Sequence, residues 1–183
     1  MIVLRSITTA GTGGEVQAIL PYKTPSCADV AHPINVGGHG DPDSSTGEVI
    51  ENLIFRNIDI LEHDEDDPMY QGCMTVDCGD RNRVRNVLFE DIRVEHIQEG
   101  RLFYVKVRFN PKYDRQPGSS IEGVVFRNIT YTGVGENRSL IQGLSRDGMV
   151  RNVTFENVTI NGEKMRDLKE AVTNEFISNV SVK

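Results

Sequence analysis

The stretch AHPINVGGHGD, near the start of the chain, gathers residue types that do chemistry: two histidines, an aspartate and several glycines. His32 and His39 flank a brief apolar–polar alternation that is typical of a short strand. An imidazole carries protons or binds ligands near neutral pH, and glycines let a ligand approach the backbone closely. We therefore predict a ligand site at this stretch. A buried structural role for His32 and simple exposure of His39 are the alternatives.

A second stretch, LEHDEDDPMYQG, is dense in carboxylates and leads into the predicted strand CMTVDCGD. In that strand Asp77 points outward if Met74 and Val76 point inward. Hydrolysis of a glycosidic bond needs two carboxyl groups, an acid with a raised pKa and a base or nucleophile. Inverting enzymes hold them about 6.5–9.5 Å apart, which is close to two inter-strand steps of ~4.8 Å. The candidate catalytic residues are Asp64, Asp66 and Asp67, one of them paired with Asp77 or Asp41.

The acidic stretch has two other interpretations. Carboxylate oxygens are ligands that Ca²⁺ prefers, so a calcium site is an alternative, with Glu62, Asp64, Glu65 and Asp66 as its ligands. The spacing matches no defined calcium-binding loop, and a plain solvated acidic turn is the third interpretation. Basic residues on the following segments are predicted to bind substrate hydroxyls or carboxylates: Arg81, Arg101 and Lys106.

The elements that position these residues come from an internal repeat. Four segments align without gaps: ENLIFRNIDI from Glu51, RNVLFEDIRV from Arg85, EGVVFRNITY from Glu122 and RNVTFENVTI from Arg151. A fifth, SNVSVK, begins at Ser178, and the starts lie 27 to 37 residues apart. Each copy alternates apolar and polar residues with a phase slip at one polar position, which indicates two short strands joined at a corner. The segments PINVGG, GCMTVDCG, LFYVKVRF and SLIQGL supply a third strand per repeat.

Three strands per repeat predict an all-β fold, a right-handed parallel β-helix of about five coils over residues 28–183. The aligned phenylalanines should stack as an internal ladder: Phe55, Phe89, Phe126 and Phe155. The polar residues at the phase slip should form a corner ladder: Asn57, Asp91, Asn128 and Asn157. Residues 1–27 match no repeat and are predicted to be an N-terminal cap or irregular segment, and NGEKMRDLKEAVTNEF to be a short C-terminal helix or loop cap. A β-sandwich with repeated strands is the alternative.

The repeat pattern N-V-x-F-x-N-I-x-I resembles the pectin-lyase-like β-helix superfamily, in particular the family 28 glycoside hydrolases, which are polygalacturonases and their relatives. In that family a GHG-x-SIGS element places a histidine in the active cleft. AHPINVGG is similar to this element, so the resemblance aligns His32 with that histidine, although Pro33 stands where the family has glycine. The resemblance thus implies that His32 is catalytic and that Asn35, His39 and Asp41 bind substrate. The family's catalytic carboxylates lie on earlier coils in NTD and DD motifs, and neither motif precedes His32. The chain therefore resembles the C-terminal half of such an enzyme, or a short relative with a relocated site.

Net charge, composition and the cysteine pattern restrict the classes of partner and the cellular location that the sequence supports. The net charge of −7 argues against nucleic-acid binding, which needs Lys and Arg to neutralise phosphates. No apolar run approaches the ~20 residues of a membrane span. The cysteines Cys27, Cys73 and Cys78 are predicted to be inert thiols, because the pair in CMTVDC faces opposite sides of a strand. The N-terminus is not a convincing secretory signal, so the chain is expected to be cytoplasmic as it stands, or extracellular by the resemblance.

Two functions are predicted. The first is a polysaccharide-degrading glycoside hydrolase that uses carboxylate acid/base catalysis in a groove along the coils, with an oligosaccharide or polysaccharide as partner and Ca²⁺ as its one candidate cofactor. The second is a non-catalytic β-helix that binds carbohydrate or serves as an oligomeric structural module. The missing upstream aspartates favour the second, and the clustered His, Asp and Gly favour the first. A short stack has two exposed ends, so a homo-oligomer is expected in either case.

Overall fold

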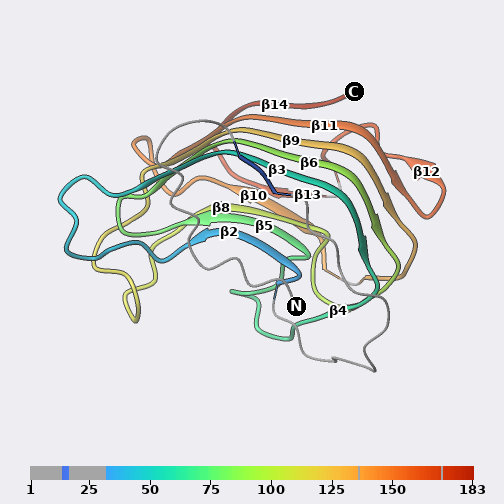
Figure 1. Ribbon diagram of the computed structural model, residues 1–183, viewed down its shortest axis with the longest axis horizontal. Helices are drawn as coiled ribbons and strands as arrows, with labels where there is room; N and C mark the ends of the chain where they lie inside the picture. Colours follow the sequence, from blue (N-terminus) through green and yellow to red (C-terminus); the bar gives the residue numbers. More distant parts are fainter. Residues whose placement is uncertain (1–13, 17–31, 136, 170) are drawn as a thin grey trace.

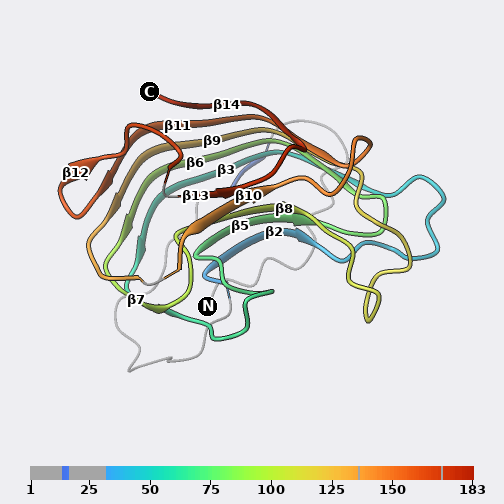
Figure 2. The same ribbon diagram turned by 180° about the vertical axis from the view of Figure 1, so that it is seen from behind.

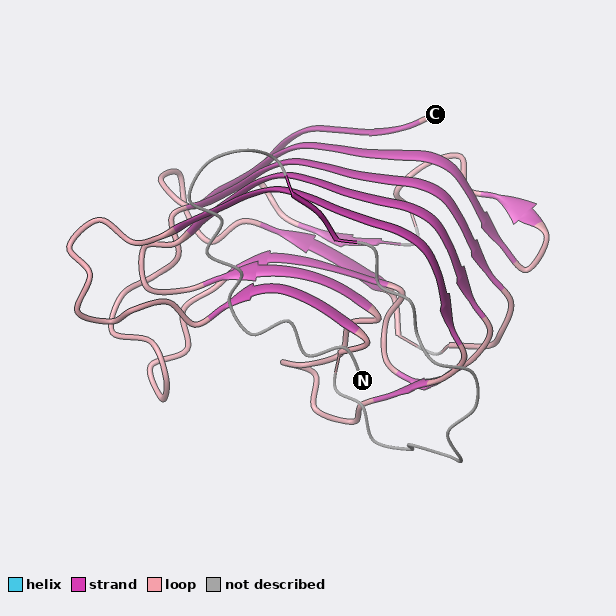
Figure 3. Cartoon of the chain, viewed as in Figure 1, coloured by secondary structure: helices cyan, strands magenta, loops and turns pink. Residues whose placement is uncertain are grey.

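The computed structural model describes residues 14–16, 32–135, 137–169 and 171–183 (Figure 1). Within these ranges the chain is all-β, as predicted, and consists of strands, turns and loops without any helix (Figure 3). This part of the chain accordingly holds no helix that is long and apolar enough to span a bilayer. The predicted N-terminal cap, residues 1–27, lies outside the described residues except for β1 (Gly14–Val16).

The larger sheet stacks the predicted repeats one on another. Its parallel strands follow in the order β1, β3 (Val49–Ile60), β6 (Arg83–Val94), β9 (Ser120–Tyr131), β11 (Met149–Ile160) and β14 (Ile177–Val182). The sheet is mixed, because β12 (Glu163–Lys164) pairs antiparallel with β11. Figure 1 shows the long strands lying side by side from β3 to β14.

Each of the four complete repeats forms one bent strand of 12 residues, so the prediction of two short strands is wrong. The predicted corner residues Asn57, Asp91, Asn128 and Asn157 have φ values from 52° to 57°. Asn and Asp adopt this left-handed conformation at lower cost than other non-glycine residues, so the strand bends there and then resumes its pairing. The corner ladder is confirmed between neighbouring strands: Nδ2 of Asn128 donates to Asp91 and Nδ2 of Asn157 donates to Asn128, both at 2.9 Å.

A second parallel sheet lies opposite the first, as both views show (Figures 1 and 2). Its strands are ordered β2 (Ile34–Gly38), β5 (Met74–Cys78), β8 (Phe103–Val107), β10 (Ser139–Gln142) and β13 (Ala171–Thr173). These are the predicted third strands of the repeats, together with one further strand at the C-terminal edge. A small parallel pair, β4 (His63–Asp64) and β7 (Ile97–Glu99), forms a third sheet.

The core between the two large sheets is built around a stack of phenylalanines, which confirms the predicted ladder. Phe55, Phe89, Phe126 and Phe155 are register partners on successive strands, with ring centroids 4.9 to 5.1 Å apart and planes within 14° of parallel. Phe103 of the second sheet packs against this stack, 4.6 Å from the ring of Phe126. Each such aromatic pair contributes about 0.5–1.5 kcal/mol beyond the burial of its area. The stack therefore fixes the register of the long strands, and Phe103 connects it to the opposite sheet.

The segment after β11 contains no helix among its described residues, so the helix alternative for the C-terminal cap is wrong. It consists of turns and loop together with two short strands, β12 and β13, which pair with β11 and β10. Asn161 and Gly162 have φ values of 51° and 81° and turn the chain back from β11 into β12. Asn-Gly is a favoured pair for a two-residue hairpin turn, because both residues need positive φ. Nδ2 of Asn161 also donates to the carbonyl of Gly133 at 2.7 Å, which ties the turn to the loop after β9.

Candidate active site

Strand alternation places two rows of side chains on the outer face of the second sheet, meaning the face turned away from the phenylalanine stack. Met74, Val76 and Cys78 of β5 belong to the core, so Thr75 and Asp77 face outward. Register extends each position across the strands. The first row is Asn35, Thr75, Tyr104 and Leu140, and the second row is Gly37, Asp77, Lys106 and Gln142.

Four side chains meet where β2, β5 and β8 end, and we call them the His39 cluster: His39, Asp77, Arg108 and Asp114. Nδ1 of His39 lies 2.5 Å from Oδ1 of Asp114, and Nη2 of Arg108 lies 3.1 Å from Nε2 of His39. Nε of Arg108 forms an ion pair with Oδ2 of Asp77 at 3.1 Å. A guanidinium has only donors, so these contacts assign a neutral imidazole in which Nδ1–H donates to Asp114 and Nε2 accepts from Arg108.

The His39 cluster is buried except for the imidazole. The side chains of Asp77 and Arg108 are each 3% exposed and that of Asp114 is not exposed, whereas His39 is 36% exposed. Burial raises the pKa of Asp77, while the charge of Arg108 opposes the rise and the charge of Asp114 adds to it. A buried carboxyl of this kind keeps its proton to a higher pH than an exposed aspartate does. The cluster therefore presents an imidazole to solvent with a protonatable acid behind it.

Asp80 fixes the loop that carries Asp114. Its Oδ1 accepts hydrogen bonds from the backbone N–H groups of Arg115 at 2.8 Å and Gln116 at 3.1 Å. Gly79 is required beside this loop, because a Cβ at that position would lie 2.7 Å from Oδ1 of Asp114. These contacts hold a loop residue next to a strand end that is distant in sequence.

His32 lies at the other end of β2 from His39. Its Nδ1 is 3.2 Å from Oγ1 of Thr75 and 3.4 Å from the carbonyl oxygen of Gly72, and its ring packs on Tyr70 with centroids 5.7 Å apart. Burial lowers the pKa of His32 to about 4. His32 is therefore a neutral, hydrogen-bonded ring at neutral pH, and it takes no part in the His39 cluster.

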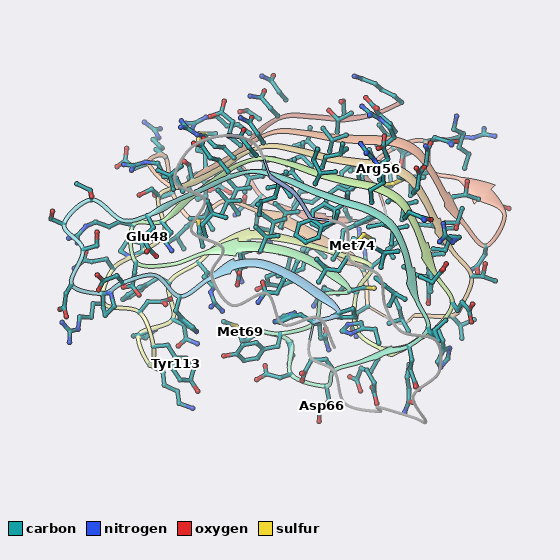
Figure 4. The ribbon with its side chains drawn as sticks, viewed as in Figure 1. Glu48, Arg56, Asp66, Met69, Met74 and Tyr113 are labelled. Atoms are coloured by element: carbon teal, nitrogen blue, oxygen red, sulfur yellow. The ribbon has the colours of Figure 1, made fainter. Side chains whose placement is uncertain are left out.

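The acidic stretch does not join the His39 cluster either. Asp66 and Asp67 are exposed, and Oδ1 of Asp67 accepts the backbone N–H of Met69 at 2.9 Å. Asp64 is in β4, opposite Glu99 of β7. Figure 4 shows Asp66 at the lower edge of the molecule, pointing away from the sheets, and Tyr113 on a loop at another side.

The proposed calcium ligands are not gathered into one cluster. Across the described ranges, no three His, Cys, Asp or Glu side chains are placed so that they could hold a metal ion. The proposed ligands Glu62, Asp64, Glu65 and Asp66 therefore do not form a metal site here.

The fold places the predicted substrate-binding residues in different surroundings. Lys106 lies beside Asp77 on the outer face, and burial together with two nearby guanidiniums lowers its pKa. Arg101 donates from Nη1 to the carbonyl of Arg138 at 2.6 Å. Asp41 is exposed, and Arg81 donates to the carbonyl of Ser44 at 3.0 Å, which holds a loop. The cysteines Cys73 and Cys78 are buried free thiols whose pKa burial raises, consistent with inert groups.

Two members of the His39 cluster are absent from the sequence predictions. Arg108 continues the outward alternation of Tyr104 and Lys106 by one more step, so the period of the strand could have identified it. Asp114 lies in an irregular loop, and nothing in the sequence pattern marks it.

The chain matches no protein-family model, and neither the curated proteins nor the solved structures include one with significant similarity to it.

Proposed function

We propose that this protein is a polysaccharide-degrading glycoside hydrolase built on a right-handed parallel β-helix of about five coils. The proposal takes the substrate to lie along the outer face of the second sheet and the reaction to occur at the His39 cluster. The parallel registers, the phenylalanine stack and the resemblance of the repeat to the family 28 hydrolases support the architecture.

One observation carries the chemistry: a buried carboxyl with a raised pKa, Asp77, shares a cluster with a second carboxyl, Asp114. Glycoside hydrolysis needs an acid that is protonated at working pH and a second group that activates water. In the proposal Asp77 gives its proton to the glycosidic oxygen as the bond to the anomeric carbon breaks. Nε2 of His39 takes a proton from the attacking water, and Asp114 stabilises the imidazolium that results. Proton transfer from His39 to Asp77 through solvent restores the starting state.

This assignment requires a rearrangement at Arg108, which contacts both Asp77 and His39. The substrate must displace the guanidinium before the acid reaches the glycosidic oxygen and Nε2 reaches water. In the proposal a substrate hydroxyl or ring oxygen takes over the donors of Arg108, because a guanidinium left without an acceptor in a buried site is costly.

A non-catalytic carbohydrate-binding role is the second candidate, and the same contacts favour it. Asp77 and His39 are already paired with Arg108 and Asp114, and such pairs also occur as purely structural ion-pair networks. In that case the outer face binds a glycan without cleaving it.

The test is release of reducing ends from a panel of neutral and acidic polysaccharides. We expect cleavage by the unmutated protein and a loss of at least a hundredfold in Asp77→Asn and His39→Gln, as removal of a general acid or base produces. Asp167→Asn is the matched control, because Asp167 is exposed, pairs with Lys169 and lies outside the His39 cluster. Binding without cleavage in the unmutated protein would exclude the hydrolase and support the second candidate.

A further inference from the structure

The larger sheet has a face that is turned away from the phenylalanine stack, and two columns of charged side chains cross it. Strand alternation turns these side chains outward, and the register aligns them from β3 to β11. The first column is Glu51, Arg85, Glu122 and Arg151, and the second column is Arg56, Glu90, Arg127 and Glu156. Each column changes sign at every step. We call the two columns and the residues between them the charged face.

Ion pairs connect neighbouring members of the second column. Glu90 lies between Arg56 and Arg127, with N–O distances of 2.6 and 3.0 Å, and Nε of Arg127 lies 2.7 Å from Glu156. The first column has one such pair, between Arg85 and Glu51. The four side chains of the second column are 15% to 41% exposed. A carboxylate has two oxygens and a guanidinium has five N–H groups, so each can contact a further partner from outside the chain.

Aliphatic side chains lie between the two columns. Ile54, Leu88 and Val125 are in register and half-buried, and Thr154 continues their row on β11. Protein interfaces commonly have an apolar centre from which water is excluded and a polar rim around it. The charged face has this arrangement, with an aliphatic strip at its centre and a charged column on each side.

The order of the charges identifies a second copy of this chain as the partner. With a two-fold axis parallel to the strands, each column faces its own copy in reverse order. Reversal of a four-member alternating column inverts every sign, so Glu90 faces Arg127 of the second copy. With a two-fold axis along the stacking direction, the first column faces the second column, and Glu90 faces Arg85 of the second copy. In both arrangements every charge of the columns meets its opposite and the aliphatic strip meets itself.

We propose that the charged face is the interface of a two-fold symmetric dimer of this chain. Facing sheets pack about 10 Å apart, a distance that charged side chains from the two sides span. The charged face measures roughly 20 Å by 20 Å, about half of the ~800 Å² per partner in a standard interface, so we expect a weak dimer with a micromolar dissociation constant. The proposal is independent of the proposed function, because the His39 cluster belongs to the second sheet, on the other side of the core (Figures 1 and 2).

Sedimentation equilibrium of the unmutated protein from about 1 µM to 1 mM tests for the dimer. Leu88→Lys places an ammonium group in the middle of the aliphatic strip. We expect its association to be at least about tenfold weaker, because an unpaired charge in an apolar contact is costly. Leu61→Lys is the matched control: Leu61 is 56% exposed and follows β3, beyond the bend at Asn57 and off the charged face. We expect this control to associate as the unmutated protein does, with melting temperatures showing that both variants are folded.

Charge swaps test the pairing across the interface. Glu90→Arg alone puts like charges opposite each other in both arrangements, so we expect association at least about tenfold weaker. Glu90→Arg combined with Arg127→Glu has the same number of like-charge neighbours within its column, but it restores opposite charges across an axis parallel to the strands. Glu90→Arg combined with Arg85→Glu restores them across an axis along the stacking direction. We expect one of these double variants to dimerise as the unmutated protein does.

The outcomes either support the dimer or overturn it. A monomer at every concentration overturns it. A dimer that Leu88→Lys and Glu90→Arg leave intact uses another surface and overturns the charged face as the interface. If both double variants fold and neither restores association, the charges act only within the chain, and the proposal is overturned as well. Where a swap fails to fold, the comparison of Leu88→Lys with Leu61→Lys decides alone. Cleavage is tested separately, by the Asp77 and His39 variants.

Discussion

Replacing Arg108 by methionine removes the guanidinium that faces Asp77 and keeps most of the side-chain volume. Both side chains are 3% exposed, so the substitution leaves a buried carboxyl without its counter-charge. Removing one partner of a buried ion pair costs about 3–5 kcal/mol, mainly because the remaining charge is not compensated. We expect a loss of this size in the free energy of unfolding at neutral pH.

The cost should shrink in acid. The folded-state pKa of Asp77 lies above its unfolded value, because burial raises it more than Arg108 lowers it. Stability linked to this proton is complete below the unfolded pKa and is lost as the pH rises through the folded pKa. Without Arg108 the folded pKa moves higher still, and the loss accumulates at up to about 1.4 kcal/mol per pH unit. Near the unfolded pKa of about 4, a neutral buried carboxyl remains, and the expected cost is only about 1–3 kcal/mol.

Urea denaturation of the unmutated protein and of Arg108→Met at several pH values measures this difference. Arg93→Met is the control, because Arg93 pairs with Asp59 on the surface, where the two side chains are 44% and 56% exposed. Such a pair contributes about 0–1 kcal/mol. If Arg108→Met costs the same at every pH, or no more than Arg93→Met, then Asp77 is not the buried, proton-binding group described here.

Three further outcomes test the packing around the site. His32→Gln should make the protein less sensitive to acid. Because the folded-state pKa of His32 is lowered from 6.5 to about 4, its neutral ring contributes stability above pH 6.5, and this contribution is lost as the pH falls through 4. In denaturation curves, about 3 kcal/mol of the stability change between these pH values should therefore disappear in the variant. Gly37→Ala should unfold the protein or cost several kcal/mol of stability, since the added Cβ would lie 1.7 Å from the carbonyl oxygen of Asp77. Gly38→Ala is the control, because nothing lies within 4 Å of its Cβ position. It should lose only the about 1–3 kcal/mol of stability that a non-glycine residue costs at a φ of 95°. Phe126→Ala should cost about 3–5 kcal/mol by calorimetry, and equal stability would contradict the stacked core.

The two large sheets could be predicted because every repeat carries the same alternation. Once Phe55 and its three equivalents are taken as one stack, the register of the long strands follows without further information. The bend at Asn57 was predicted at the right residue but with the wrong consequence. A polar residue at a phase slip fits a corner between strands, and it fits equally a single left-handed residue inside a continuous strand. Hydrogen bonds on both sides of the bend decide between these, and they depend on the neighbouring coil.

The composition of the final segment favoured a helix, and a local turn prevented it. NGEKMRDLKEAVTNEF contains good helix formers, but its first two residues, Asn161 and Gly162, are the pair that most strongly favours a hairpin turn. The turn closes onto Gly133 of the preceding coil, so tertiary contact and turn chemistry act together against the propensity of the residues that follow.

The candidate site shows a similar division. Asp77, Lys106 and Asn35 could be placed on one face from the period of the strand, because alternation is a local property. The pairing of His39 with Asp114, 75 residues apart, could not. It depends on where the irregular loop that carries Asp114 crosses the strand ends. Asp80 and Gly79 fix the position of this loop, and their contacts produce no periodic pattern in the sequence.

The acidic stretch was the strongest sequence signal for catalysis, but the structure does not bring it to the His39 cluster. A carboxyl works as an acid near neutral pH only when its surroundings disfavour the charged form. Asp66 and Asp67 are exposed to water. Asp77 stands alone in its strand, yet burial among paired groups raises its pKa. In a parallel sheet, the outward positions of the inner strands are the ones that neighbouring strands and loops can cover, so under the proposed function an isolated outward carboxyl is a better candidate for an acid than a crowded loop.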